Sequence, residues 1–227
     1  IKPFYYAKMN GTFMYASEIK SLLRHPDFVK ELNAEALKPY MTFQYPAIGE
    51  TFFKGVYKLP EGHYFTYRDG KMDIHRYYDE DFREGKQKLG ELVNSIDQTV
   101  CDSVKAHQIA DVEVGSFLSS GVDSSYVAAV ARPQHTYSIG FGKGTYNESQ
   151  QAGELAELLK LNNTAESLTD EEAFAAFPRI QWHLDEPDSN PSCVPLYFLS
   201  ALAAKDVKVV LSGEGADELF AGYIDYG

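Results

Sequence analysis

The sequence predicts an α+β region followed by an α/β region built on a parallel sheet. Short aromatic strands separated by turn residues occupy positions 1–78, and such strands are typical of antiparallel sheets. After position 78, short apolar strands alternate with amphipathic helices, a pattern typical of a parallel sheet covered on both faces. The length of 227 residues allows one or two domains, and we expect two, at 1–78 and 79–227.

The first region is expected to open with an antiparallel hairpin. Asn10-Gly11 lies between two aromatic strands, Phe4–Ala7 and Thr12–Ala16, and Asn-Gly is the strongest short hairpin signal. Ser17 is placed to cap a short helix over Glu18–Arg24. Three more strands are expected at Phe52–Leu59, His63–Arg68 and Met72–Tyr78.

The second region should alternate helices with strands. Apolar residues recur at helical spacing through Leu89–His107. Val207–Leu211 is a continuous apolar strand of the kind buried on both faces. The other expected elements are strands at Val112–Leu118 and Thr136–Phe141, and helices at Ser124–Ala131, Asn147–Leu161, Ala173–His183 and Pro195–Lys205. Because parallel strands end at one edge of their sheet, a binding crevice is expected at that edge.

Composition excludes several function classes. The chain carries 21 basic and 33 acidic residues, a formal net charge of −12, so it offers no basic face for a nucleic-acid partner. It contains no apolar run of the ~20 residues that cross a bilayer and no signal peptide, so we expect a cytoplasmic protein with no membrane partner. Its two cysteines, Cys101 and Cys193, exclude a disulfide-rich scaffold and an all-cysteine zinc site.

The first candidate site is a loop that follows a strand and opens a helix. It reads Phe117-Leu118-Ser119-Ser120-Gly121-Val122-Asp123-Ser124-Ser125. Small residues let backbone N–H groups approach an anion, and the helix N-terminus adds partial positive charge. The loop lacks the Gly-Lys-Ser/Thr of a Walker A sequence. It has the properties of a phosphate cradle; the alternative is that Ser119 and Ser120 only cap the helix.

The second candidate site repeats this arrangement. It reads Leu211-Ser212-Gly213-Glu214-Gly215-Ala216-Asp217-Glu218 and again follows an apolar strand. On neighbouring strands, the two loops would bring Asp123 and Asp217 to one edge of the sheet. Paired carboxylates beside a phosphate site suggest Mg²⁺, which prefers oxygen ligands and bridges to phosphates. The alternative is that Asp217 and Glu218 only complement a helix N-terminus.

These motifs resemble those of a known family. Ser-Ser-Gly-Val-Asp-Ser-Ser is similar to the pyrophosphate loop of ATP pyrophosphatases. Ser-Gly-Glu-Gly-Ala-Asp-Glu-Leu-Phe-Ala-Gly-Tyr resembles the synthetase domain of glutamine-dependent asparagine synthetases and their β-lactam synthetase relatives. Segments at 1–6, 16–20 and 59–62 resemble late strands of that family's glutaminase domain, and Arg76-Tyr77-Tyr78 resembles the segment joining the domains.

The resemblance implies a fold for each region. Residues 1–78 would be the C-terminal part of an N-terminal-nucleophile-type glutaminase domain with antiparallel β-structure. Residues 79–227 would be the N-terminal part of a parallel-sheet synthetase domain of the ATP-pyrophosphatase type, which is similar to adenine nucleotide alpha hydrolases. As such a fragment, the chain alone is expected to be inactive.

The resemblance also implies a reaction, that of a carbon–nitrogen ligase of the asparagine synthase (glutamine-hydrolysing) class. ATP activates the β-carboxylate of aspartate as an acyl-adenylate and releases pyrophosphate. Ammonia released from glutamine then attacks the activated carbonyl. ATP and Mg²⁺ are the implied cofactors, and ATP, aspartate and glutamine-derived ammonia the implied small-molecule partners. Homodimer formation is left open.

The resemblance assigns roles to individual residues. Those expected to hold pyrophosphate are Ser119, Gly121, Asp123 and Ser124. Those expected to contact the AMP portion are Leu118, Ile139, Gly140, Ser212 and Gly213. Asp123 and Asp217 would bind Mg²⁺, which offsets charge on the leaving group, and Glu214 would assist at the reacting centre. Asp185, in His-Leu-Asp-Glu-Pro, would lie at the acyl-acceptor site; the alternative is that Glu186-Pro187 only ends a helix.

The sequence also departs from the family pattern. Ser120 replaces the first Gly of the common pyrophosphate loop, so it must accept a backbone shape suited to Gly or shift the loop. Neither Cys101 nor Cys193 is placed as the glutaminase nucleophile. No Arg occurs between Asp188 and Pro195, which leaves the carboxylate substrate open. Two alternatives therefore stand: a relative that adenylates another carboxylate, as β-lactam synthetases do, and a nucleotide-binding module without turnover.

Overall fold

The computed structural model describes residues 2–81, 85–141 and 148–223. The chain divides into two compact units, Ile1–Gly85 with Pro178–Asn190, and Lys86–Phe177 with Pro191–Gly227. The segment Pro178–Asn190 thus belongs to the first unit although it follows most of the second in sequence. The expected domain boundary after residue 78 stays a prediction.

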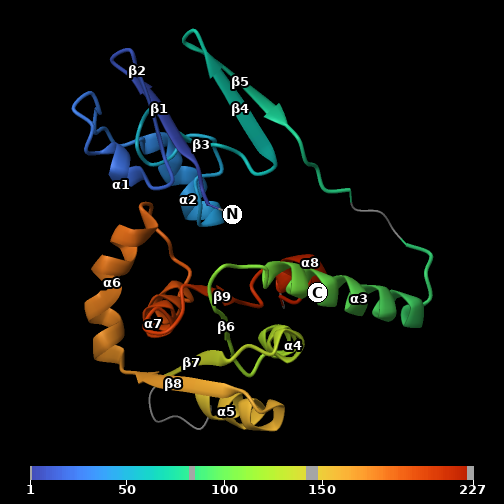
Figure 1. Ribbon diagram of the computed structural model, residues 1–227. Helices are drawn as coiled ribbons and strands as arrows, with labels where there is room; N and C mark the ends of the chain where they lie inside the picture. The colour runs from blue at the N-terminus through green and yellow to red at the C-terminus, as the bar shows by residue number, and fades with distance from the viewer. Residues whose placement is uncertain (1, 82–84, 142–147, 224–227) are drawn as a thin grey trace. The chain divides into compact units, whose positions relative to one another are not determined.

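The first unit contains two antiparallel sheets (Figure 1). One has the order β2-β1-β3, with strands at Tyr5–Met9 (β1), Thr12–Ala16 (β2) and Val56–Lys58 (β3). The other pairs His63–Arg68 (β4) with Lys71–Arg76 (β5). Asn10 and Gly11 have φ of 50° and 82°, as a tight hairpin turn between β1 and β2 requires. The predicted hairpin at Asn10-Gly11 is therefore confirmed, and β4 and β5 confirm two of the other predicted strands, whereas β3 is shorter than expected because a turn with Gly55 at φ 77° precedes it.

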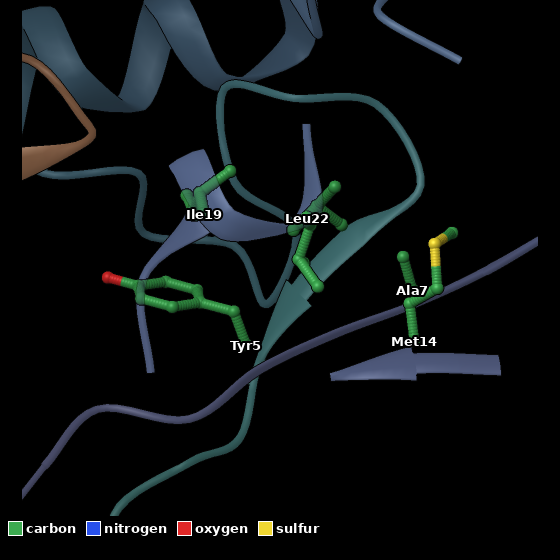
Figure 2. Close-up of a cluster of buried hydrophobic side chains, with 6 residues drawn as sticks. Tyr5, Ala7, Met14, Ile19 and Leu22 are labelled. Atoms are coloured by element: carbon green, nitrogen blue, oxygen red, sulfur yellow. The ribbon is translucent and has the colours of Figure 1, made fainter. Parts of the chain in front are cut away.

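The hydrophobic core of this unit joins the strands to a short helix. Figure 2 shows Tyr5 and Ala7 of β1, Met14 of β2, and two residues of α1 (Ile19–Leu22) gathered in one cluster. Alternate side chains of a strand point to the same face, so Tyr5 and Ala7 both reach this core. Burying these side chains fixes α1 against the sheet.

The predicted cap of α1 is wrong. The helix begins after Glu18, which makes no side-chain cap, so Ser17 does not cap it. Instead, the Asp185 carboxylate accepts the N–H groups of Ile19 at 2.7 Å and Lys20 at 3.2 Å. A partner 166 residues away in sequence therefore satisfies the free donors of the first turn.

A further helical segment of the first unit was not predicted. The chain forms a 3₁₀ turn at Ala34–Ala36 (η1) and then the helix Leu37–Phe43 (α2). The Asn33 side chain caps the turn by accepting the Glu35 N–H at 3.1 Å. Pro39 obscured the helical pattern, although Pro is tolerated in a first turn.

The second unit is built on a parallel sheet, as predicted. Its order is β8-β7-β6-β9, with strands at Val114–Phe117 (β6), His135–Phe141 (β7), Asn162–Leu168 (β8) and Val209–Leu211 (β9). Its helices are Leu89–His107 (α3), Val122–Ala131 (α4), Glu148–Leu159 (α5), Asp170–Leu184 (α6), Cys193–Ala203 (α7) and Ala216–Phe220 (α8). Helix α6 continues into the first unit at Pro178, and the predicted helix start at Asn147 lies outside the described residues.

Two strand expectations need correction. Strand β8 was not predicted, because its sequence Asn-Asn-Thr-Ala-Glu-Ser-Leu is polar and mostly exposed at the edge of the described sheet. Strand β9 was expected to be buried on both faces, yet it forms the other edge of that sheet and leaves Val209 38% exposed. Apolar composition alone does not distinguish an edge strand from a central one.

Two small cores flank the parallel sheet. Leu118 packs with Ala128 of α4 and Ala152 and Ala156 of α5. Tyr137 of β7 packs with Leu202 and Ala203 of α7 and with Val207, with Phe117 against them. The adjacent residues Phe117 and Leu118 thus serve opposite faces, which confirms a sheet covered on both sides. In the described parts of the chain, no helix has the length and apolar character needed to span a membrane.

Glu186 provides a test of the packing in the first unit. Burial raises the pKa of its carboxyl, while the Phe52 N–H that it accepts at 2.9 Å opposes the rise. Because the pKa of this carboxyl is higher in the folded state than in the unfolded state, its neutral form stabilises the fold. This stabilisation is fully present below the unfolded pKa and is lost as pH rises through the folded pKa. Glu186→Gln retains an acceptor and removes the charge, so we expect Tm at neutral pH to rise by roughly 1–3 °C.

The rise in Tm of Glu186→Gln should be smaller at an acidic pH near the ordinary pKa of a glutamate. Thermal unfolding followed by circular dichroism at both pH values measures it, with Glu157→Gln on the exposed side of α5 as the matched control. An unchanged pH profile in Glu186→Gln would contradict the prediction.

Candidate functional site

A cavity of about 370 Å³ lies in the second unit, where β6 and β9 end. The loop after β6 and the loop after β9 supply most of its wall, and Ile139 of β7 and residues near the start of α7 complete it. The lining residues are Phe117, Leu118, Ser119, Gly121, Asp123, Ser124, Ile139, Ser192, Pro195, Leu196, Leu199, Ser212, Gly213, Glu214, Gly215, Asp217 and Tyr223. The carboxyl edge of a parallel sheet is where such folds bind ligands.

Hydroxyl groups hold the first loop in shape. The Ser119 N–H donates to Ser124 Oγ at 3.1 Å, and the two hydroxyls are 2.7 Å apart. The Gly121 N–H donates to Ser119 Oγ at 3.1 Å. Helix α4 starts at Gly121 with no side-chain cap, so the alternative that Ser119 and Ser120 only cap the helix is wrong. These bonds fix a loop whose next backbone groups belong to a helix N-terminus, a geometry that suits an anion.

Ser120 adopts no backbone conformation reserved for Gly. It is absent from the described non-glycine residues with positive φ, and the following Gly121 has φ −71°. A β-carbon is therefore tolerated at the position where the common pyrophosphate loop has its first Gly.

The second loop packs directly on the first turn of α4. A β-carbon on Gly213 would lie 2.7 Å from the Ser124 nitrogen and 2.9 Å from the Asp123 carbonyl carbon. Only Gly allows that approach, since both neighbours are backbone atoms. The Glu214 N–H donates to Ser212 Oγ at 3.3 Å. The two loops thus form one continuous wall.

The structure brings together nearly all the predicted site residues. Leu118, Ser119, Gly121, Asp123, Ser124, Ile139, Ser212, Gly213, Glu214 and Asp217 all line the cavity. Gly140 is buried and does not line it. Asp185 belongs to the first unit and caps α1, so its contacts give no support to an acceptor-site role.

Part of the cavity wall was not predicted from the sequence. Pro195, Leu196 and Leu199 lie on α7 at the spacing of one helix face. That spacing predicts a buried face, but it does not reveal that the face borders a cavity. Tyr223 also lines it and donates to Glu218 at 2.8 Å, a bond that raises the pKa of the phenol to about 12.

The charged residues of the lining are all acidic. They are Asp123, Glu214 and Asp217, and no Lys, Arg or His is found among the described lining residues. Asp217 and Glu218 occupy the first turn of α8, so they also complement a helix N-terminus, as the alternative held. A polyanionic ligand would need a cation here to offset repulsion from three carboxylates.

The donor set suits Mg²⁺ shared with a ligand. Asp123 and Asp217 both line one cavity, and Mg²⁺ is commonly held by one or two carboxylates together with phosphates. The described residues contain no group of three or more His, Cys, Asp or Glu able to hold a metal by themselves. The protein would therefore supply only part of such a coordination shell.

Gly213 gives a stability test of the contact between the loops. Gly213→Ala places a methyl group against backbone atoms of α4, so we expect a loss of roughly 1–3 kcal/mol in the free energy of unfolding. Gly153→Ala in α5 meets no atom within 4 Å and should gain up to about 1 kcal/mol. Urea denaturation measures both, and equal midpoints for the two variants would contradict the contact.

Comparisons with known proteins cover the whole chain. Residues 95–227 match the family described as Asparagine synthase, and residues 1–78 match the Glutamine amidotransferase domain. The chain is 40% identical to asparagine synthetase [glutamine-hydrolyzing] 1 of Bacillus subtilis (strain 168), over 100% of this chain and 36% of that protein. It is 28% identical to asparagine synthetase [glutamine-hydrolyzing] 3 of the same organism, over 98% of this chain and 40% of that protein.

The chain therefore spans well under half the length of these curated relatives. Among solved structures, NMN synthetase from Francisella tularensis is similar with a TM-score of 0.40 and 22% identity, over 61% of this chain and 60% of that chain. A TM-score this low does not establish a shared fold, so the fold of the second unit is assigned from its parallel sheet alone.

Proposed function

The chain belongs to the asparagine synthase family, and from this premise we propose that the protein carrying it performs ATP-dependent amide synthesis. Aspartate, ATP and glutamine would be converted to asparagine, AMP, pyrophosphate and glutamate. The observation that carries the proposal is the cavity in which the loop after β6 and the loop after β9 meet, with the Gly213 loop seated on the first turn of α4.

The first loop would hold the phosphates. Ser119, Gly121 and Ser124 combine small side chains with a hydroxyl-braced backbone at the start of α4. Asp123 and Asp217 would hold Mg²⁺, which would supply positive charge to offset that of the leaving pyrophosphate. The apolar part of the wall, including Leu118 and Ile139, suits the flat faces of an adenine base.

The chemistry would proceed in two steps. An oxygen of the aspartate β-carboxylate forms a bond to the α-phosphorus of ATP, and the bond from that phosphorus to pyrophosphate breaks. Ammonia then adds to the activated carbonyl, and AMP leaves with the electron pair of the C–O bond. Glu214, which lines the same cavity as Asp123 and Asp217, would accept a proton from the attacking nitrogen.

Residues 1–78 would form part of the glutaminase that supplies ammonia. The match to the Glutamine amidotransferase domain and the antiparallel sheets β2-β1-β3 and β4-β5 support this assignment. These 78 residues contain no cysteine, because both cysteines lie after them, so they do not provide a thiol nucleophile. Cytoplasmic localisation and a homodimer stay predictions.

A second candidate function differs in the acid that is activated. The described lining has no basic side chain to pair with the α-carboxylate of aspartate, and residues 188–195 contain no Arg. Another carboxylic acid would then be adenylated by the same loops.

Isotope exchange between ATP and pyrophosphate separates these candidates. The full-length protein, given Mg²⁺ and a panel of carboxylic acids, should exchange with aspartate at least roughly ten times faster than with glutamate or β-alanine derivatives. Exchange supported by another acid and not by aspartate would favour the second candidate. Binding of Mg-ATP without exchange for any acid would point to a module without turnover.

Asp217 tests the metal assignment. Asp217→Ala removes a carboxylate from the cavity wall, and we expect Mg²⁺-dependent exchange to fall roughly 100-fold or more, with glutamine- and ammonia-supported rates falling together.

Glu214→Gln should keep the affinity for Mg-ATP and lose turnover, because its proposed role lies at the carbonyl. Glu157→Gln is the matched surface control. Unimpaired exchange in Asp217→Ala would contradict the metal site.

A further inference from the structure

Three buried hydroxyl groups lie in the two central strands of the described parallel sheet. Ser116 on β6 is 0% exposed, and Thr136 and Ser138 on β7 are 0% and 1% exposed. Central strands of a parallel sheet usually carry apolar residues, because both of their faces are covered. A hydroxyl buried in such a place costs free energy unless it forms hydrogen bonds. The groups that these hydroxyls contact therefore indicate what each of them does.

Ser138 holds the chain at the point where the loop after β6 leaves the sheet. Its Oγ donates to the Leu118 carbonyl at 2.7 Å, and the Leu118 N–H donates to the Tyr137 carbonyl at 2.8 Å. Strand β7 thus binds both polar backbone groups of Leu118. Ser119 and Gly121, whose contacts brace the loop, follow at once. The position of Leu118 therefore sets where the braced loop begins.

The contact with Leu118 is the strongest that the Ser138 hydroxyl makes. A serine hydroxyl has one proton to donate, and Ser138 Oγ also lies 3.0 Å from Asn163 Oδ1. The 2.7 Å distance to the Leu118 carbonyl is that of a well-formed O–H···O bond. Leu118 and Ile139, the residue after Ser138, both line the cavity, whereas Ser138 is not among the described lining residues. Ser138 therefore acts on the site through its neighbours.

Ser116 makes a weaker contact with the start of the other loop. Its Oγ lies 3.3 Å from the carbonyl of Leu211, the last residue of β9, and 3.1 Å from the Phe117 carbonyl. The loop with Ser212 and Gly213 follows Leu211 directly. One proton is shared between two carbonyls, and both distances are longer than that from Ser138 to its carbonyl, so this hydroxyl restrains its loop less.

Thr136 has the same surroundings as Ser138 but contacts a different part of the sheet. The two residues share a face of β7, because alternate side chains of a strand point the same way. Thr136 Oγ1 donates to the Asn162 carbonyl at 3.1 Å and lies 3.1 Å from Asn163 Oδ1. Asn162 is the first residue of β8, whereas the cavity lies where β6 and β9 end. Thr136 is thus a matched hydroxyl with no printed contact to a site loop among the described residues.

We propose that Ser138 is a positioning residue for the loop after β6, and that Ser116 has a weaker role of the same kind for the loop after β9. The inference rests on the proposed function, in which the first loop holds the phosphates of ATP. With the Ser138 hydroxyl in place, the Leu118 carbonyl is fixed and the loop N–H groups start from a defined position. Without it, that carbonyl loses its side-chain donor and the loop binds a triphosphate less tightly.

The test compares Ser138→Ala with Thr136→Val in the full-length protein. Each substitution removes one buried hydroxyl from the same face of β7 and takes a side-chain donor from a main-chain carbonyl, so both should lower Tm. Only Ser138→Ala removes a contact with a site loop. Ser116→Ala serves as a third variant, for the weaker contact.

The main measurement is the Kd of Mg-ATP by isothermal titration calorimetry, with Tm measured on the same samples. We expect Kd to rise roughly 5- to 20-fold in Ser138→Ala, less in Ser116→Ala and not at all in Thr136→Val. A merely structural role would lower Tm in Ser138→Ala and Thr136→Val and give the two variants the same Kd, and that result would overturn the proposal. If Ser138→Ala does not fold, Ser138→Cys, which keeps a weaker donor, takes its place under the same criterion.

Hydrogen exchange gives a readout independent of the ligand. Amides at 119–124 should exchange faster in Ser138→Ala than in Thr136→Val, and equal exchange would overturn the proposal. If the unmodified protein binds Mg-ATP but forms AMP with no acid, the proposed function fails, while the comparison of Kd values still decides the role of Ser138. If the unmodified protein does not bind Mg-ATP, both proposals fail.

Discussion

The register between β6 and β9 is the constraint on which the candidate site depends. These parallel strands pair Val114 with Val209 and Ser116 with Leu211, so the loops that follow them leave the sheet at the same level. Gly115 allows this pairing to sit tightly, because a β-carbon there would meet Tyr137 and Val207 at 3.1–3.2 Å. A slip of one residue would turn every side chain to the opposite face and separate the loop with Asp123 from the loop with Asp217.

This register also explains how so acidic a chain could receive a polyphosphate. The net charge is −12 and the charged lining residues are carboxylates, so attraction by basic side chains is not the device used on this wall. Backbone N–H groups and a bound metal ion would provide positive potential without a basic residue. Both sources of positive potential require the loop after β6 and the loop after β9 to lie next to each other, and the strand pairing provides that arrangement.

Much of the fold follows from local sequence, because its signals are local. Asn10-Gly11 specifies a turn through its backbone preferences, and the predicted hairpin forms as expected. The loops after β6 and β9 were also predicted, because their strand–loop–helix arrangement lies within a few residues of sequence. What could not be predicted depends on distant partners. The edge strand β8 lacks an apolar pattern, and the α7 face borders the cavity only through the tertiary fold. The helix α1 takes its cap from Asp185, 166 residues away, and no rule of spacing could supply that partner in place of Ser17.

The segment Pro178–Asn190 belongs to the first unit although the sequence on both sides of it belongs to the second, and this limits how such proteins can evolve. A glutaminase and a synthetase joined by a simple linker could be recombined freely with other partners. Here Lys20 lies in the stretch that matches the Glutamine amidotransferase domain and its buried partner Asp185 lies in the stretch that matches Asparagine synthase. Separating the two residues would leave an uncompensated charge in the interior of each fragment. Losing the charge at position 20 alone would leave the Asp185 carboxylate without its buried counter-charge, whereas exchanging the charges at positions 20 and 185 together would keep the pair.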